Sequence, residues 1–261
     1  MALNGNKANI LYDNLMRRHA VTYSGAIVSG FEAINAYDWR DFSIFRAAVG
    51  TTNLDTTTDE EETIDCCALW AVARSIVGTV TLQLEESPGV FTTKATFSLV
   101  ANEEHLAMAS FTAVVLPSGR IIRWVIAAGA AVLNIRQMAV GLKLSNPIGQ
   151  YVGQTPASLH QGFVTTSIIS VNGSHIGRNW RRLERKDTLS WEHLERAWVR
   201  TYWEPFSLHA ARYSFFYQWA PVSFPGEVVL AAAESIDAPV NKTVDRMAVT
   251  MPLLCLGKRP V

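Results

Sequence analysis

The first half of the chain alternates apolar and polar residues in short runs separated by turn-forming residues. The run Thr79-Val-Thr-Leu-Gln-Leu84 alternates strictly, which is typical of a half-buried strand. No helix-length periodic segment separates the runs, so residues 1–145 are predicted to form an antiparallel β-sandwich rather than a parallel α/β sheet. The expected strands are Ala20–Val28, Glu62–Val72, Gly78–Glu85, Phe91–Val100, Phe111–Leu116, Ile121–Ile126 and Val132–Leu142.

Two polar stretches interrupt this pattern. Thr51–Glu62 is polar and strongly acidic, and is predicted to be a surface loop. Leu144–Thr155 contains Gly and Pro residues and few periodic apolar positions, so we place a domain boundary between residues 145 and 146.

The second half of the chain begins with one long alternating segment, which is followed by a segment of helical spacing. Thr165–Glu192 alternates around a turn at residues 172–174 and predicts a long two-stranded ribbon. Trp191–Ala211 has helical spacing, with an apolar stripe that is expected to be core, and Pro205 is expected to end or bend the helix. The stripe consists of Trp191, Leu194, Trp198 and Tyr202. Further strands are predicted at Phe215–Trp219, Val228–Ala233 and Met247–Leu256.

Composition narrows the class of protein. Hydrophobic residues make up 49% of the chain and charged residues 18%, so it can bury substantial cores. Acidic and basic residues balance at 23 each, which removes the simplest argument for binding nucleic acid or an anionic membrane. Eight Trp and eleven Phe suit cores and protein interfaces alike.

Residues that could perform chemistry are scattered. The cysteines, Cys66, Cys67 and Cys255, are expected to be buried free thiols, since adjacent cysteines on a strand point to opposite faces. No two histidines have the three- or four-residue spacing of a helical zinc site, and a lone histidine is expected to be a solvated side chain. We expect no enzyme activity, no catalytic residues, no cofactor and no metal.

The acidic segment offers one alternative to a solvated loop, a calcium site or carboxylate pair. Calcium loops need a Gly for the sharp turn, and none lies between Gly50 and Asp65. A solvated acidic loop is therefore favoured. Its acidic residues are Asp55, Asp59, Glu60, Glu61, Glu62 and Asp65.

No signal peptide is evident in Met1–Lys7, and the apolar run Ile121–Ile135 is too short to cross a bilayer. We therefore expect a soluble chain that is made in the cytoplasm, without membrane insertion.

One basic cluster lies within the predicted ribbon. On an extended ribbon three of its residues would share one face and two the other. Three interpretations stay open: a solvated strand tip, pairing with acidic residues of an adjacent subunit, or contact with nucleic acid in a channel. The cluster consists of Arg178, Arg181, Arg182, Arg185 and Lys186.

Several segments together resemble structural proteins of tailed-bacteriophage virions. Asn9–Asn14, Asn35–Arg46, Glu62–Trp70 and Thr79–Leu84 look like their discoidin-like (galactose-binding-like) jelly-roll sandwiches. The more specific likeness, to the C-terminal half of those proteins, lies in Ile148–Pro156, Ile176–Arg178, Trp198–Phe206 (Trp-x-x-x-x-Trp-Glu-Pro-Phe) and Ala211–Trp219.

The resemblance implies a component of a phage tail tip or baseplate, similar to distal tail proteins. Residues 146–261 would then form a tail-tube-like β-barrel, with the ribbon and one helix. By resemblance the subunits form threefold or sixfold homo-oligomeric rings that join the tube to the hub or fibres, with transient contact to DNA in the lumen.

A binding module is the alternative function. The sandwich would then recognise a host-surface glycan, with loop aromatics stacking on sugar rings. The candidates are Tyr37, Trp39 and Phe42, for which core packing is the competing interpretation.

Overall fold

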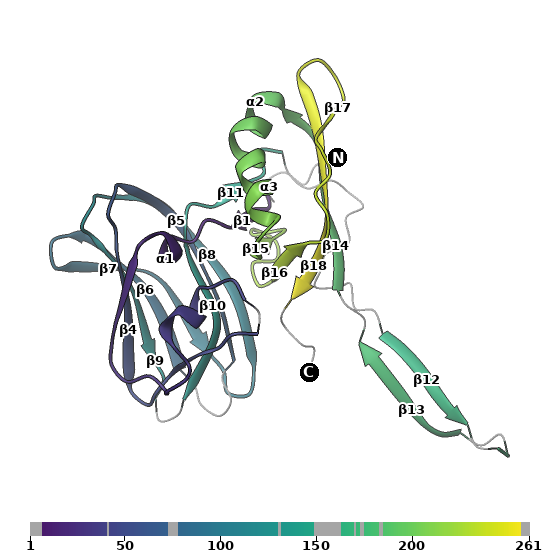
Figure 1. The fold of residues 1–261 in the computed structure, drawn as a ribbon, viewed down its shortest axis with the longest axis horizontal. Coiled ribbons are helices and arrows are strands. Elements are labelled where there is room, and N and C mark those ends of the chain that lie inside the picture. Colours follow the sequence, from purple (N-terminus) through teal and green to yellow (C-terminus); the bar gives the residue numbers. More distant parts are fainter. Residues whose placement is uncertain are drawn as a thin grey trace.

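The computed structural model describes residues 7–40, 42–72, 78–129, 132–148, 163–169, 171–172, 175–182 and 185–256. Figure 1 shows three parts: a β-sandwich, a second sheet with a helix beside it, and a two-stranded hairpin that projects away from both. The described residues are mainly β, and all paired strands are antiparallel, as the alternating pattern predicts.

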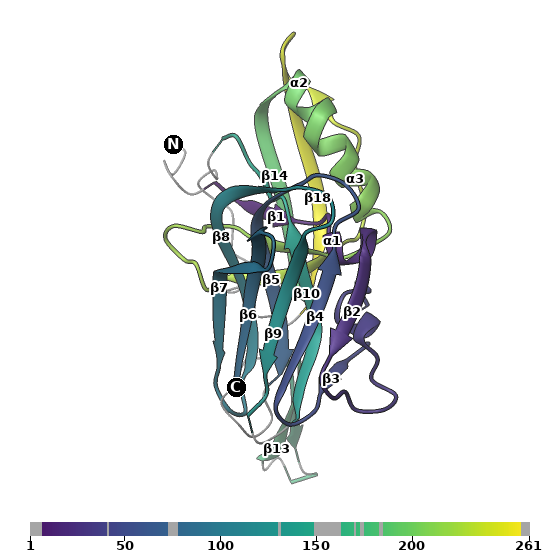
Figure 2. The same ribbon diagram turned by 90° about the vertical axis from the view of Figure 1, so that its left-hand side faces the viewer.

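Two antiparallel sheets form the sandwich. Figure 2 shows the five-stranded sheet face-on, with β7, β6, β9, β4 and β2 side by side. Its strands are β2 (Ala20–Ser24), β4 (Thr51–Thr57), β6 (Gly78–Ser87), β7 (Val90–Leu99) and β9 (Ile121–Ala127). The four-stranded sheet has the order β3–β10–β5–β8. Its strands are β3 (Phe45–Ala47), β5 (Glu62–Val72), β8 (Glu104–Leu116) and β10 (Leu133–Gly141). The seven strands predicted in this half are confirmed to within a few residues at most ends.

Alternation explains the core of the sandwich. Val80, Leu82 and Leu84 are buried on β6, and the intervening residues are not fully buried. Trp124 lies fully buried on the neighbouring β9 and stacks on Phe97. Because successive residues of a strand point to opposite faces, these apolar positions meet between the sheets.

Two short helical turns pack on the core of the sandwich, α1 (Leu15–Arg18) and the 3₁₀ turn η1 (Ala33–Ala36). The buried Asn14 caps α1 and joins it to β10. Its Oδ1 accepts hydrogen bonds from the backbone of Met16 and Val140, and its Nδ2 donates one to the carbonyl of Met138. All three bonds satisfy a buried amide that would otherwise be costly.

The loop predicted at Thr51–Glu62 is wrong except at residues 58–61, which connect β4 to β5. Thr51–Thr57 is strand β4, paired with β2 and β9. Thr52, Leu54 and Thr56 are buried at alternate positions. Threonine is β-branched and favours strands, and the Thr52 hydroxyl donates to the carbonyl of Ala26, so its burial does not leave it unbonded. Because two of these three buried residues are polar, the alternation of buried and exposed positions does not appear in the sequence as an alternation of apolar and polar residues.

The second sheet has the order β11–β1–β15–β16–β18–β14, and β17 pairs with β18. Its strands are β1 (Asn9–Leu11), β11 (Leu144–Ser145), β14 (Arg185–Glu195), β15 (Phe215–Gln218), β16 (Val228–Ala233), β17 (Val240–Asn241) and β18 (Arg246–Leu256). The described strands do not close into a barrel, since β11 and β14 are edges. The predicted barrel is therefore not confirmed. Strand β1 belongs to this sheet, and the boundary between residues 145 and 146 stays a prediction.

A helix spanning three consecutive segments covers one face of this sheet (Figure 1). The segments are α2 (Arg196–Trp198), the π-helical turn η2 (Val199–Trp203) and α3 (Glu204–Ala210). Its buried residues are Val199, Trp203, Phe206 and Ala210. They pack on the apolar face of β14 and β18.

The predicted helix start at Trp191 is wrong. Trp191 and Leu194 are buried residues of β14, and the register against β18 shifts between them. His193, within the shift, has φ +59°. A β-bulge adds one residue to a strand, so two residues three apart come to the same face. This spacing imitates one turn of a helix.

Pro205 lies in the first turn of α3, and the helix continues to Ala210. Of the two alternatives predicted for Pro205, that it ends or bends the helix, the first is therefore wrong. Proline has no N–H to donate to the preceding turn. The wider π turn comes just before it, with the Glu204 N–H donating to the carbonyl of Val199. A π turn of this kind accommodates the missing donor within a continuous helix.

The sandwich and the second sheet share an apolar contact. Trp70, Leu106 and Ala139 of the sandwich pack in one buried cluster with Phe216 and Leu230 of the second sheet. The two parts are therefore joined through side chains as well as through the chain itself.

The ribbon is shorter than predicted. Strands β12 (Phe163–Ile169) and β13 (His175–Arg182) pair only with each other within the described part of the chain. Residues 185–192, expected in the ribbon, belong to β14 and pair with β18. Gly173 and Ser174 of the predicted turn lie outside the described residues, as do residues 149–155 of the predicted linker and His160.

Candidate functional site

The projecting hairpin β12–β13, called the arm below, is the feature that stands apart from the packed body (Figure 1). Its backbone register runs from Phe163 opposite Arg182 to Ile169 opposite His175. Ile168 and Val171 are exposed apolar residues. An isolated two-stranded hairpin is only marginally stable in water, so a surface that covers the arm would stabilise it.

The predicted basic cluster is divided between two sheets. Arg178, Arg181 and Arg182 lie on β13, whereas Arg185 and Lys186 lie at the start of β14. The Lys186 ammonium forms an ion pair with Glu234 at 2.5 Å. The expectation that all five residues alternate along one ribbon is therefore wrong, because β14 pairs with β18.

Strand β14 is an edge of the second sheet within the described residues. Leu189, Trp191 and Leu194 face the core, and the intervening side chains are polar or charged. Lys186, Glu192 and Glu195 each form an ion pair, with Glu234, Lys242 and Arg246 respectively. Charged side chains along an edge oppose unwanted strand pairing.

The three aromatic residues proposed for glycan contact lie in different surroundings. Trp39 is only 5% exposed and contacts Phe216 and His209. Tyr37 is half-buried against the sandwich core, and burial, with the nearby Asp38 carboxylate, raises the pKa of its hydroxyl. Phe42 is 75% exposed. Trp39 packs in the core, so the three residues do not form one exposed aromatic surface.

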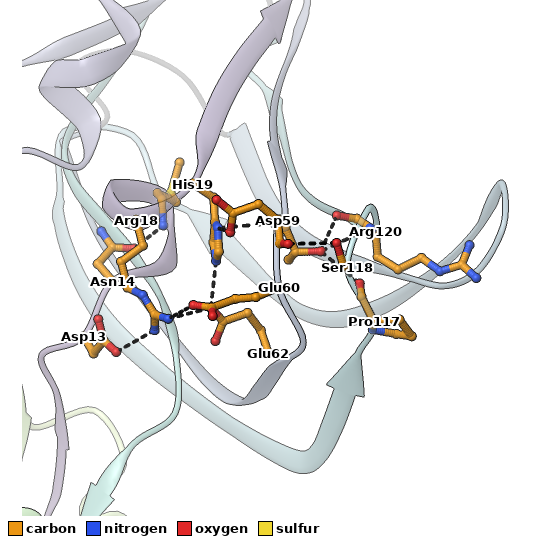
Figure 3. Close-up of polar contacts among 12 residues, drawn as sticks. Asp13, Asn14, Arg18, His19, Asp59, Glu60, Glu62, Pro117, Ser118 and Arg120 are labelled. Carbon is orange, nitrogen blue, oxygen red and sulfur yellow. Dashed lines mark hydrogen bonds and ion pairs between the residues drawn. The ribbon is translucent and has the colours of Figure 1, made fainter.

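A charged cluster joins α1 to the turn between β4 and β5 (Figure 3). The His19 side chain is 1% exposed. Its Nδ1 lies 2.6 Å from Asp59 Oδ1, and its Nε2 lies 2.8 Å from Glu62 Oε1. Arg18 contacts Glu60 and Glu62 at 2.6 and 2.8 Å. The expectation that each histidine is a solvated side chain is wrong for His19, which the sequence could not reveal because its partners are more than 35 residues away.

Two further acidic residues of this segment, Asp55 and Asp65, are also paired. Asp55 bonds Arg123, and Asp65 accepts from both the backbone and the ammonium of Lys143. Within the described residues no group of three or more His, Cys, Asp or Glu side chains is placed to hold a metal ion. The acidic segment is thus bound to basic partners of the sandwich rather than solvated throughout.

All three cysteines are buried and free, as predicted. Burial raises the pKa of Cys66 to about 12, and it raises the pKa of Cys67 as well. A thiol in this state is a poor nucleophile. None of the helices within the described ranges is long and apolar enough to cross a membrane.

The sequence pattern did not predict a second exposed feature, the loop that joins β15 to β16. The loop joining β15 to β16 holds Trp219 stacked on Phe224, and the Trp219 indole donates to Glu227 at 2.5 Å. Backbone bonds from Phe224 to Ala220 and from Glu227 to Phe224 fix its shape. Pro221 and Pro225 in the sequence were the available signal for an ordered turn.

Comparisons with known proteins do not establish a family for this chain. No protein-family model matches the sequence, and no curated protein matches it. Solved structures that resemble about half of the chain include several carbohydrate-binding modules. They include the CBM32 of AlyQ in complex with 4,5-unsaturated mannuronic acid (21% identity, 50% of this chain, 96% of that chain, TM-score 0.38).

Two further structures cover similar shares. Chitosan-binding module 1 from the chitosanase/glucanase of Paenibacillus sp. IK-5 is 20% identical over 49% of this chain and 98% of its own, with a TM-score of 0.38. CBM32-1 from a family 31 glycoside hydrolase of Clostridium perfringens is 13% identical over 50% of this chain and 99% of its own, with a TM-score of 0.39. Because these TM-scores lie below 0.5, the likeness assigns neither a family nor a ligand to this chain.

Proposed function

We propose that this chain is a non-catalytic structural subunit of a bacteriophage tail tip or baseplate, and that it assembles with copies of itself through the arm. The observation that carries the proposal is a hairpin whose strands pair only with each other within the described residues. The tail assignment and a threefold or sixfold ring rest on the sequence resemblance described above.

The physical argument concerns the free energy of the arm. Ordering a residue costs about 1–2 kcal/mol of backbone entropy, and a hairpin without a packed face recovers little of it. Covering exposed apolar residues such as Ile168 recovers about 25 cal/mol per Å² of apolar surface. A neighbouring subunit would supply such a surface in an assembled ring. The outer edges of β12 and β13 would also offer backbone groups for strand pairing.

A deletion tests the role of the arm. Val164 and Arg181 are register partners, so replacing residues 165–180 by Asn-Gly closes the hairpin with a two-residue turn. We expect the variant to keep the thermal stability of the body and to sediment as a smaller species than the full chain. If the full chain is monomeric at high concentration, or if the variant assembles equally well, assembly through the arm is excluded.

Charge substitutions test the role of the arm in assembly without shortening it. Arg178→Glu with Arg182→Glu reverses two charges on β13, and Arg120→Glu is the control in the turn between β8 and β9, where the side chain points away from the charged cluster (Figure 3). We expect the β13 variant to assemble more weakly and the Arg120 variant to assemble normally. Equal assembly of both variants would argue against contacts through β13.

The position in a virion needs a separate measurement. Cryo-electron microscopy of intact particles would give the symmetry and neighbours, which we expect to be tube, hub or fibre proteins. A particle in which this chain is absent from the tail would refute the tail assignment while leaving self-assembly in place.

Glycan binding by the sandwich is a second candidate, because Phe42 presents 75% of its surface to solvent. An exposed ring can stack on the apolar face of a sugar. We expect binding on a glycan array to depend on Phe42 and to be lost in Phe42→Ala. The control Val49→Ala changes another exposed apolar residue of the sandwich. An array without binding removes this candidate.

A further inference from the structure

His209 lies near the C-terminal end of α3, where the helix meets the sandwich. Its ring contacts Tyr12 and Trp39, with centroid distances of 5.3 and 5.9 Å, both edge-to-face. A third ring, Tyr213, lies 5.2 Å away. Tyr12 follows β1, and Trp39 follows η1 on the sandwich. The imidazole is therefore surrounded by aromatic rings from three segments of the chain.

Two polar atoms in this cluster are buried without a hydrogen-bond partner among the described residues: His209 Nε2 and Trp39 Nε1. The imidazole also bonds to the backbone of Ser214. Because Nε2 has no partner, we assign that bond to Nδ1. Neutral His209 then carries its proton on Nδ1, and a second proton on Nε2 would add a buried donor without an acceptor.

Trp39 is held at this site despite backbone strain. Its φ of +62° lies in the left-handed region, which costs a bulky residue about 1–2 kcal/mol. Packing against His209 and Phe216 offsets that cost. The strained backbone at Trp39 is therefore maintained in part by its contacts with the helix and with β15, and loosening these contacts removes that support.

The charged and titratable groups near His209 come from each neighbouring segment. Asp13 favours the protonated ring and Arg17 opposes it, and Tyr12 and Tyr213 contribute phenol groups. Asp13 is also the partner of Arg18 at 3.0 Å, and the Arg17 guanidinium lies 4.2 Å from the Tyr213 ring centroid. Burial is the largest influence, and it lowers the pKa of His209.

We propose that His209 makes the contact between α3 and the sandwich sensitive to acid: protonation places a charge and an unpartnered N–H among Tyr12, Trp39 and Tyr213, and loosens the helix from the segment that carries Trp39. This inference does not depend on the proposed role in a phage tail. It concerns movement at the junction of the two parts, not unfolding of either core.

The direction of the effect follows from linkage. A histidine whose pKa is lower in the folded state gives its full stabilisation above the ordinary value of about 6.5. As the pH falls through that value, the loosened state binds the proton first and becomes more populated. The effect reaches its limit once the pH is below the folded-state value.

Hydrogen exchange of the full chain at pH 7.5 and 5.5, corrected for intrinsic rates, tests the proposal. We expect amides of 204–216 and 36–40 to exchange about threefold faster or more at pH 5.5, a modest fraction of the tenfold change that one pKa unit represents. Amides of β5 serve as the internal reference and should keep their protection. Unchanged or slower exchange of 204–216, as a stabilising cation–π contact would give, overturns the proposal.

Two substitutions separate His209 from other titrating groups. His209→Phe keeps a ring but cannot be protonated, so the difference between the two pH values should disappear. His19→Gln removes a buried histidine of the sandwich and should leave the difference intact. If His209→Phe does not fold, His209→Gln replaces it in the same measurement. A pH response that persists without His209, or that vanishes with His19→Gln, assigns the sensitivity elsewhere.

Discussion

Asp55 on β4 and Arg123 on β9 are register partners joined by two hydrogen bonds. Arg123 Nε donates to Oδ1 at 2.8 Å, and Arg123 Nη2 donates to Oδ2 at 2.7 Å. The Arg123 guanidinium also lies 4.0 Å from the centroid of Phe91 on β7. Three strands of the five-stranded sheet are thus tied together on one face by one side chain.

We expect Asp55→Asn to lower the free energy of unfolding by about 1–2 kcal/mol, because it removes the charge from a two-bond pair that is mostly shielded from solvent. Urea denaturation measures the change. Asp237→Asn, at an exposed site, is the control and should stay within about 0.5 kcal/mol of the parent. Equal effects of the two substitutions would mean that the Asp55 pair contributes nothing.

The buried face of the helix predicts a contrast between adjacent residues. Trp203 is 1% exposed and Tyr202 is 49% exposed. We expect Trp203→Ala to cost about 3–5 kcal/mol and Tyr202→Ala less than about 1 kcal/mol. Thermal unfolding of both variants checks the contrast. Should Tyr202→Ala be the more damaging, the originally predicted stripe through Trp198 and Tyr202 would be the buried one.

His193 predicts a backbone effect at the bulge in β14. Its φ of +59° suits glycine and strains a β-branched residue. We expect His193→Gly to be tolerated, and His193→Val to destabilise the protein by about 1–2 kcal/mol. Calorimetry of the pair provides the measurement. If Val is as well tolerated as Gly, the backbone at this position does not hold the left-handed conformation.

Cys66 predicts how stability depends on alkaline pH. Burial raises its pKa to about 12 from the usual 9.0, so the folded state keeps the thiol neutral. The stabilisation is complete below pH 9. It declines as the pH rises toward 12, because the unfolded chain releases its proton first. We expect denaturation midpoints to fall over this range, and to fall less in Cys66→Ala.

A thiol reagent gives a second readout at pH 8. Cys66 and Cys67 should react only as fast as the protein unfolds, since both thiols are buried and protonated. Rapid labelling of either thiol in the native protein would contradict their burial.

Local pattern was sufficient for most of the strands. Glu62–Val72 and Val228–Ala233 were predicted with the bounds that the structure has, because alternation or an uninterrupted apolar run is a property of the segment itself. Thr51–Thr57 was missed because two of its three inward positions are threonines, and the Thr52 hydroxyl finds its acceptor, the Ala26 carbonyl, only after the chain folds.

The candidate sites depended more on distant partners. Trp39 was a candidate for sugar stacking, yet its ring packs against Phe216 and His209, more than 150 residues further along the chain. His19 was expected in solvent, yet it lies between Asp59 and Glu62. Contacts between residues so far apart in the sequence leave no trace in the local alternation of apolar and polar residues.

Local sequence patterns are enough to predict a mainly β chain with a sandwich, a helix and an alternating hairpin, because strand period and turn chemistry are encoded within a few residues. The pairing of β14 with β18 in place of the ribbon, and the bulge that brings Trp191 and Leu194 to one sheet face, become visible only in the folded chain. Strand pairing is chosen by the energy of the whole sheet, and residues far apart in the sequence contribute to it.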